Sequence, residues 1–121
     1  MYRGKPQKLQ KVEKATRSDA LPVIEGGEYV KIYFHTEKLL CALSTMVPGQ
    51  VGEYDEGHRG AEEVCFCIDG TIAVHFPRQD TYVELQQDDA VIIPEGEAHQ
   101  ITNVGDTLAK MLFFAAPHIG R

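Results

Sequence analysis

The chain has 121 residues, of which 43% are hydrophobic and 25% charged, and its formal net charge at pH 7 is −6. This length and composition predict one globular domain with a single core. No apolar run approaches the roughly 20 residues of a membrane-spanning helix. The polar start, MYRGKPQKLQK, lacks the apolar stretch of a signal peptide, and the odd number of cysteines argues against a disulfide framework, so we expect a cytoplasmic protein.

The charge is unevenly distributed along the chain. Residues 1–17 contain six Lys and Arg residues against one acid, a local charge of +5, which leaves −11 on residues 18–121. An acidic body disfavours nucleic acid as a partner, because affinity there depends on neutralising phosphates. The arm lacks the interleaved aromatic residues of a nucleic-acid tail. We therefore expect residues 1–20 to form a mobile or weakly helical basic arm, with Leu9 and Val12 docked on a single domain at 21–121.

From Leu21 onward the sequence is typical of β structure. Residues 29–36 alternate between apolar and polar, with Val30, Ile32 and Phe34 on one face. Further short strands are expected at residues 39–46, 63–68, 71–76, 81–85, 90–93, 99–103 and 108–116. Asp69-Gly70, between two of them, is the sequence of a tight β-hairpin. The close spacing of the turns and the lack of a long helical pattern predict an all-β sandwich or barrel.

The stretch EGHRGAEEV, residues 56–64, is either a solvated acidic loop or a source of metal ligands. Alternate residues of a strand share a face, so Glu63 and Cys65 point the same way. His58 precedes Glu63 across a glycine-containing turn, and His99 opens a later strand. If the strands close into a barrel, the two histidines and Glu63 meet at one end of it. Two imidazoles and one carboxylate suit ferrous iron and related divalent metals.

Two stretches carry a resemblance to a known family. PEGEAHQITN, residues 94–103, is similar to the P-x-G-x2-H-x3-N core of the second cupin motif, and HRGAEEVCFCIDG, residues 58–70, resembles the H-x4-E-x6-G half of the first. With the strands between them, the resemblance covers residues 39–116. It implies a cupin-type double-stranded β-helix barrel, often dimeric, that binds one metal in its mouth. By this resemblance, the metal ligands of the family fall on His58, Glu63 and His99.

Two positions depart from the family pattern. The first histidine of H-x-H falls on Glu56, which we expect as a fourth metal ligand, as a catalytic proton acceptor, or as a solvent-exposed side chain. Two histidines with one or two carboxylates favour iron or manganese, with nickel or zinc as further candidates. The glycine expected before the second motif falls on Asp88, where we expect only a surface turn to change.

The resemblance implies a metal-dependent enzyme that acts on a small organic molecule, of dioxygenase type or of isomerase or lyase type. One alternative is a non-catalytic module that holds a small ligand or a structural metal, and another is a fold remnant without metal. We expect a small-molecule partner, no nucleic acid and no membrane. We also expect a homodimer in which the strand at residues 29–36 joins or covers the sheet of the second copy.

Other candidate residues are expected to be structural. Cys65 and Cys67 are expected as small buried hydrophobes. His75 is expected across the Asp69-Gly70 hairpin, on the face that points away from the metal ligands. We expect His35 and His118 at the surface.

Overall fold

The computed structural model describes residues 2 and 4–117, and the expectation for His118 lies outside this part of the chain. The described residues form nine strands and one short 3₁₀ turn, which confirms the all-β prediction. The elements are β1 (Leu21–Glu25), β2 (Glu28–His35), β3 (Leu40–Met46), β4 (Glu62–Asp69), β5 (Ile72–Phe76), η1 (Pro77–Gln79), β6 (Thr81–Leu85), β7 (Ala90–Ile93), β8 (Gln100–Asn103) and β9 (Ala109–Ala116). No helix in the described residues is long and apolar enough to cross a membrane.

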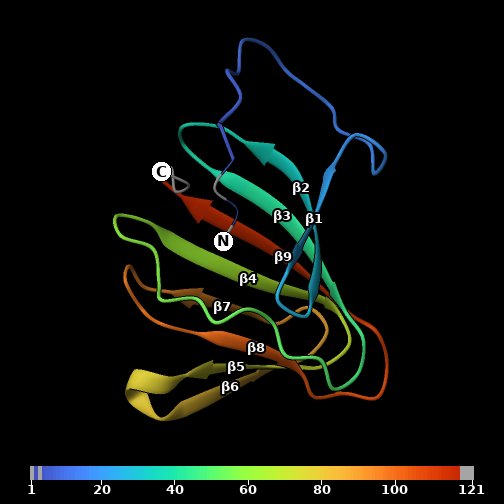
Figure 1. Cartoon of the computed structure of the whole chain (residues 1–121), viewed down its shortest axis with the longest axis vertical. Coiled ribbons are helices and arrows are strands. Elements are labelled where there is room, and N and C mark those ends of the chain that lie inside the picture. The colour runs from blue at the N-terminus through green and yellow to red at the C-terminus, as the bar shows by residue number, and fades with distance from the viewer. Residues whose placement is uncertain (1, 3, 118–121) are drawn as a thin grey trace.

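The strands form two antiparallel sheets (Figure 1). The larger sheet has six strands in the order β1-β2-β3-β9-β4-β7, and the smaller has three in the order β6-β5-β8. Inward-facing apolar side chains from both sheets pack together as one core, which includes Cys67 and Met111 from the larger sheet and Val74 and Ile101 from the smaller. A second buried cluster, with Val30, lies on β2, β3 and β9 of the larger sheet. This two-sheet arrangement is the expected jelly-roll-like barrel.

Asp69-Gly70 connects the two sheets and is not a hairpin turn. In the described residues β5 pairs with β6 and β8, whereas β4 pairs with β7 and β9, so the hairpin prediction is wrong. Gly70 has a φ of +88°, and a Cβ there would lie 2.8 Å from the Cα of Ala109. The tight turn that the sequence predicts is present, but it leads the chain from β4 in the larger sheet to β5 in the smaller one. His75 does face away from the predicted ligands, where it stacks on Tyr82 at 4.3 Å.

A β-bulge in β2 overturns the prediction for its second half. The register with β3 shifts between Ile32 and Phe34, so the alternation of buried residues changes there. Val30 and Ile32 are buried as expected, but the next inward-facing residue is His35 and not Phe34. An extra residue in one strand moves every later side chain to the opposite face. His35 is therefore 4% exposed, and the expectation of a surface histidine is wrong.

The basic arm has no helix in its described residues, 2 and 4–20. Its start crosses the end of β2, where the backbone N–H of Gln7 donates to the carbonyl of His35 at 2.6 Å. The ring of Tyr2 lies edge-on to His35, 5.5 Å between ring centroids. Beyond this contact the arm arches away from the sheet (Figure 1). Leu9 and Val12 are 58% and 98% exposed, so the expectation that these two residues dock on the body is wrong.

Candidate metal centre

Two strands deliver the predicted ligands to the interior. At the start of β4, Glu63 is 1% exposed and shares the inward face with Cys65 and Cys67, as the alternation predicted. His99 lies directly before β8 and is also buried, with Ile101 on the same face. Burial raises the pKa of the Cys65 thiol well above its usual value. The two cysteines therefore act as small apolar groups, as expected.

Four side chains converge at this end of the barrel. Asp55, His58, Glu63 and His99 each offer one ligand atom, and these atoms all lie within 4.8 Å of one another. His58 Nε2 is 2.6 Å from Glu63 Oε1 and 3.3 Å from Asp55 Oδ2. His99 Nε2 is 3.6 Å from Glu63 Oε1 and 3.8 Å from Asp55 Oδ2. The structure thus brings His58, Glu63 and His99 together and adds Asp55 to them.

Asp55 is the member of the group that sequence reasoning missed. Its backbone pairs with that of His99 through two hydrogen bonds of 2.9 and 2.8 Å, which holds it beside the inward-facing residue that opens β8. Its Oδ1 accepts a hydrogen bond from the N–H of Gly57 at 2.9 Å, so Oδ2 is left to face the histidines. An Asp two residues before a Gly is a common signal for a turn closed by its own side chain. That signal predicts the turn at Asp55, whereas the pairing with His99 that brings its side chain to the site is a long-range contact.

Glu56 lies outside this group. Its side chain is exposed and lines an outer hollow that Tyr54 and His58 also line. Adjacent residues of an extended chain point in opposite directions, so an inward Asp55 turns Glu56 outward. The structure therefore places a carboxylate near the missing histidine of the family pattern, but it is supplied by the preceding residue. A role for Glu56 as a proton acceptor stays a prediction.

Two close glycines explain how His58 reaches the group. Gly57 has a φ of +100°, and a Cβ there would lie 2.4 Å from the carbonyl carbon of Gly96. The N–H of Gly96 in turn donates to the carbonyl of His58 at 3.1 Å. The loop before β4 and the loop before β8 therefore touch backbone to backbone. A side chain at position 57 would clash with the backbone at this contact. The contact also turns His58 toward Glu63.

The hydrogen bonds of the group test whether it fits a cation. His99 Nδ1 is 2.9 Å from the carbonyl oxygen of Glu97, which only accepts, so Nδ1 carries a proton and Nε2 is an acceptor in the neutral ring. That acceptor faces the carboxylates of Asp55 and Glu63, which are acceptors too. Such a set is stable only around a positive charge. Fixing the far nitrogen of a histidine on a backbone carbonyl is how proteins orient metal-binding imidazoles, so the residues fit a metal.

A proton satisfies the same arrangement when no metal is bound. Burial alone lowers the pKa of His58, but the hydrogen bond and the charge of Glu63 outweigh it, and the charge of Asp55 adds to their effect. The net result is a His58 pKa above its ordinary value of 6.5. A divalent ion must therefore displace a proton from His58, which makes binding dependent on pH.

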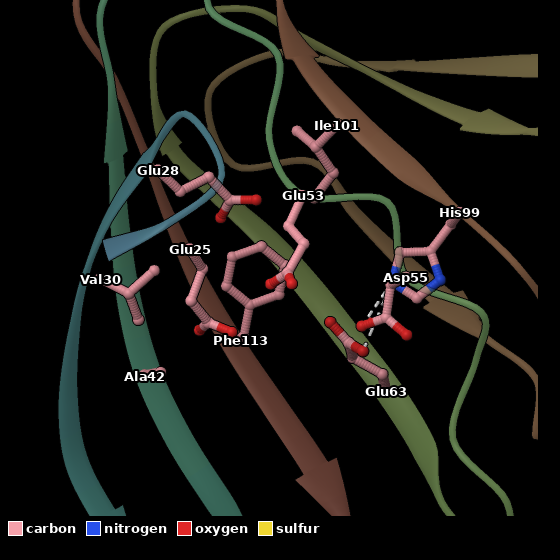
Figure 2. Close-up of a pocket in the computed structure, with 10 residues that line it drawn as sticks. All are labelled: Glu25, Glu28, Val30, Ala42, Glu53, Asp55, Glu63, His99, Ile101 and Phe113. Atoms are coloured by element: carbon pink, nitrogen blue, oxygen red, sulfur yellow. Dashed lines mark ion pairs between the residues drawn. The ribbon is translucent and has the colours of Figure 1, made fainter. Parts of the chain in front are cut away.

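A cavity lies beside the four residues, and Asp55, Glu63 and His99 form part of its wall. Figure 2 shows three further carboxyl groups on its wall, those of Glu25, Glu28 and Glu53, none of which sequence reasoning had singled out. The Glu28 carboxyl accepts a hydrogen bond from the buried Ser44 hydroxyl at 2.7 Å. Burial raises the pKa of Glu28 to about 7, and the charges of Glu25 and Glu63 add to that rise. The rest of the wall is apolar and is formed by Val30, Ala42, Ile101 and Phe113.

Comparison with known proteins identifies solved structures of similar fold. Among curated proteins the sequence finds no match. Among solved structures, KdgF from Halomonas sp. superposes with a TM-score of 0.75 at 17% identity, over 89% of this chain and 96% of that one. The polyketide cyclase RemF from Streptomyces resistomycificus gives 0.73 at 16% identity, over 92% and 83% of the two chains. A predicted oxalate decarboxylase from Thermotoga maritima gives 0.69 at 20% identity, over 87% and 99%.

These structures share the fold of this chain, and their identities are too low to carry a function across. The sequence itself supplies the family. The family model described as "Cupin domain" matches residues 42–115, which is more than half of the chain and includes all four residues of the candidate metal centre. The chain therefore belongs to the cupin family.

Proposed function

We propose that the protein is a metal-dependent enzyme that acts on a small organic molecule in the mouth of the barrel. The observation that carries the proposal is the set of four converging donors, in which His99 Nε2 is turned toward two carboxylates by the hydrogen bond at Nδ1. Two imidazoles with two carboxylates favour iron(II) or manganese(II) among divalent ions, and nickel or zinc also accept imidazole ligands.

Each residue at or next to the donors has a role of its own in binding a metal. Asp55 and Glu63 neutralise the charge of a divalent ion, and the carbonyl of Glu97 fixes the ring of His99. His58 lies between the outer hollow and Glu63, so it faces the side from which a substrate enters. A divalent ion held there would supply Lewis-acid chemistry or a place to bind oxygen.

The type of reaction is a narrower part of the proposal. The solved structures of similar fold include, by their titles, a polyketide cyclase and a predicted oxalate decarboxylase. One barrel thus supports several chemistries, and the site decides among them. We propose dioxygenase-type chemistry or isomerase- or lyase-type chemistry, which oxygen consumption separates. Uptake of oxygen by the iron-loaded protein with a turned-over substrate supports the first, and turnover without oxygen supports the second.

Metal analysis tests the proposal directly. Protein purified without chelator is offered iron(II), manganese(II), nickel(II) and zinc(II) in turn, and the bound metal is measured by elemental analysis. We expect about one ion per chain, as a single set of four ligands holds. The His58→Ala, His99→Ala double variant should hold almost none. Glu62→Gln is the matched control, because Glu62 adjoins Glu63 but is exposed on the opposite face of β4.

The same experiment separates the enzyme from its alternatives. A wild-type protein that binds none of the four metals contradicts the proposal and leaves a barrel without a metal centre. A protein that binds metal and retains a small ligand without converting it is a non-catalytic binding module. The melting temperature of the double variant is the check on folding, because the apolar core lies elsewhere in the barrel and should survive the loss of the ligands.

We also propose a cytoplasmic location and a homodimer. All three cysteines, Cys41, Cys65 and Cys67, are free thiols, which supports a reducing compartment. Support for the dimer comes from the outer face of the larger sheet, where Phe114 and Ile92 are exposed. Fractionation of the native cell tests the first proposal, and light scattering of the purified protein tests the second.

A further inference from the structure

The short turn η1 contacts the loop before β8, although the residues that meet are 18 positions apart in the chain. The guanidinium of Arg78 donates a hydrogen bond through Nη1 to the carbonyl of Gly96. The side-chain amide of Gln79 donates through Nε2 to Glu97 Oε1 at 2.8 Å. Both donors are exposed side chains, and neither belongs to the four residues of the metal centre. We call Arg78 and Gln79 the clamp.

Each of the two residues that the clamp binds also contacts one histidine of the metal centre through its backbone. The N–H of Gly96, whose carbonyl is bound by the clamp, donates to the carbonyl of His58 at 3.1 Å. The carbonyl of Glu97, whose side chain is bound by the clamp, accepts the hydrogen bond from His99 Nδ1 at 2.9 Å. The clamp is therefore connected to both histidines through one intervening residue each.

The loop contains a glycine at the point where the clamp binds it. Gly96 has a φ of +74°, and a Cβ built there would meet no atom within 4 Å. A glycine has more backbone conformations to lose on folding than any other residue, so such a loop needs contacts that fix it. The peptide that joins Gly96 to Glu97 is fixed at both ends. Arg78 binds its carbonyl, and the carbonyl of Pro94 accepts from its N–H at 3.2 Å.

The turn that carries the clamp is a rigid support. Pro77 begins the turn with a φ that its ring restricts. Asp80 ends it in the left-handed region at a φ of +50°, and its N–H donates to the carbonyl of Pro77 at 3.2 Å. The strands that the turn connects, β5 and β6, pair along all five residues of each. The clamp thus joins a glycine-containing loop to a turn whose two ends are held by paired strands.

We infer that Arg78 and Gln79 are positioning residues of the metal centre, which fix the loop at residues 94–98 so that the two histidines direct their Nε2 atoms at a cation. The inference rests on the proposed function, since the cation is the metal of that proposal. The groups that orient a metal-binding imidazole through its second nitrogen contribute roughly 10- to 100-fold to metal affinity. The clamp acts one bond further away, on the residues that orient the imidazoles, so its contribution is expected at the lower end of this range.

The double variant Arg78→Met, Gln79→Met tests the inference, because methionine keeps unbranched side chains at both positions and removes their donors. The affinity of the full chain for zinc(II) is measured by competition with a chelator. We expect the double variant to bind zinc about tenfold more weakly than the wild type, and each single variant about threefold more weakly. Removal of a cationic side chain would by itself favour a bound metal ion, because it removes a repulsion. A loss of affinity therefore cannot come from the changed charge.

The variant Arg17→Met, Gln86→Met is the matched control. It removes the same two groups at exposed positions outside η1 and the loop at 94–98. It also removes a side-chain hydrogen bond of the same kind, which Gln86 donates to Glu84 at 3.4 Å. Its zinc affinity should stay within about twofold of the wild type. Exposed hydrogen bonds contribute little to stability, so the melting temperatures of all variants should stay within about 5 °C of the wild type.

The protonation of the His99 ring gives a second measurement that needs no metal. In the metal-free wild type, the carbonyl of Glu97 keeps the proton of the neutral ring on Nδ1. In the double variant that carbonyl is no longer fixed, so the nitrogen NMR signals of the neutral ring should show a mixture of the two tautomers. The control variant should keep the single tautomer of the wild type.

Three outcomes would overturn the inference. They are an unchanged zinc affinity in the double variant, an equal loss of affinity in the control variant, and a neutral His99 ring that keeps its proton on Nδ1 in the double variant. Failure of the proposed function looks different. In that case the wild-type protein takes up no metal, but the double variant still loses the single His99 tautomer, which shows that the clamp orients this ring.

Discussion

The two faces of the six-stranded sheet each depart from the usual pattern at one place. The inner face ends in carboxyl groups, those of Glu25, Glu28 and Glu63, which line a cavity. The outer face is apolar where β3, β9, β4 and β7 lie side by side. A protein without partners buries its apolar side chains and exposes its acids. Here acids stand at one end of the mainly apolar inner face, and partly exposed apolar side chains lie on the outer face, so we propose a partner for each.

The apolar residues of the outer face form two adjacent rows across four strands. The strand registers place Cys41, Phe114, Val64 and Ile92 in one row and Leu43, Leu112, Phe66 and Ala90 in the next. Phe114 is 42% exposed and Ile92 is 60% exposed. Contiguous exposed apolar surface of this kind marks a protein interaction site. We call these eight residues the outer band.

The difference between the faces supports a separate proposal for each. Buried carboxyl groups are stable in a fold only beside cations or donors, which is the argument for a metal on the inside. The outer band is without charged residues, and a second copy of the same chain is the simplest cover for it, because two-fold dimers dominate among protein assemblies. The predicted homodimer is therefore proposed through the outer band. The strand at residues 29–36, through which the sequence predicted it, lies beside the band and not within it.

The sharpest test of the inner face compares two adjacent carboxylates. Asp55→Ala should weaken metal binding about 1,000-fold, because the 10–16 kcal/mol typical of a four-ligand site is shared among its ligands. Glu56→Ala should change the affinity less than about twofold, since the Glu56 side chain is exposed outside the group. Metal titration by competition with a chelator measures both. Equal losses in the two variants would return Glu56 to the site.

The pH dependence of metal binding follows from the same residues. The metal needs an unprotonated His58, and the neighbouring carboxylates raise the pKa of His58. Affinity should therefore fall as the pH drops through that raised pKa, and the fall should begin at a higher pH than for an isolated histidine. The titration of Asp55→Ala and Glu56→Ala over a pH series provides this measurement as well.

The second prediction concerns the effect of Glu28 on the free energy of unfolding. In the metal-free protein the pKa of Glu28 is raised from 4.5 to about 7. Between these two pH values the folded protein holds a proton that the unfolded chain has lost, so the free energy of unfolding falls as the pH rises through this window. Glu28→Gln should remove that loss, which raises the free energy of unfolding by up to about 3 kcal/mol near pH 8 and changes it little near pH 4.

Urea unfolding of the wild type and of Glu28→Gln at both pH values measures the effect. Glu62→Gln is the control, because an exposed carboxylate should give no such window. A Glu28→Gln variant that is equally stable, relative to the wild type, at both pH values would show that Glu28 titrates as an ordinary exposed acid. In that case the position of Glu28 on the inner face would not lower the free energy of unfolding.

The third prediction tests the outer face. Phe114→Lys places a charge in the middle of the outer band and should weaken the dimer about 30-fold, or about 2 kcal/mol, because an unpaired charge is then buried between the copies. Val104→Lys is the control, because Val104 is 49% exposed in a loop outside the band. Sedimentation at several protein concentrations measures the dimer. A wild-type protein that stays monomeric at micromolar concentration contradicts the proposal.

The smallest effect is expected from the basic arm. Changing Lys8, Lys11 and Lys14 to serine should alter dimer stability by less than about 1 kcal/mol, because exposed charge pairs contribute little in water. The same concentration series gives the result. A loss as large as that of Phe114→Lys would mean that the arm, and not the outer band, holds the two copies together.

The sequence by itself predicted the features that depend on neighbours along the chain. The alternation of residues in a strand has a period of two, so the inward direction of Glu63, Cys65 and Cys67 follows once β4 is recognised. The same argument predicted that His99 and Ile101 share a face. The convergence of His58, Glu63 and His99 was predicted from these directions, on condition that the strands close into a barrel, and from the family resemblance.

Only the tertiary structure decided the features that depend on which strands pair. Asp69-Gly70 has the local chemistry of a hairpin turn, but long-range pairing of β4 with β9 sends the chain to the other sheet. A bulge against β3 reverses the faces of β2 beyond Ile32 and buries His35. Asp55 enters the site because its backbone pairs with that of His99, forty-odd residues away in sequence. Glu25 and Glu28 face each other across the tight turn between β1 and β2, but Glu53 and Glu63 reach the same wall from distant segments, which local sequence does not encode.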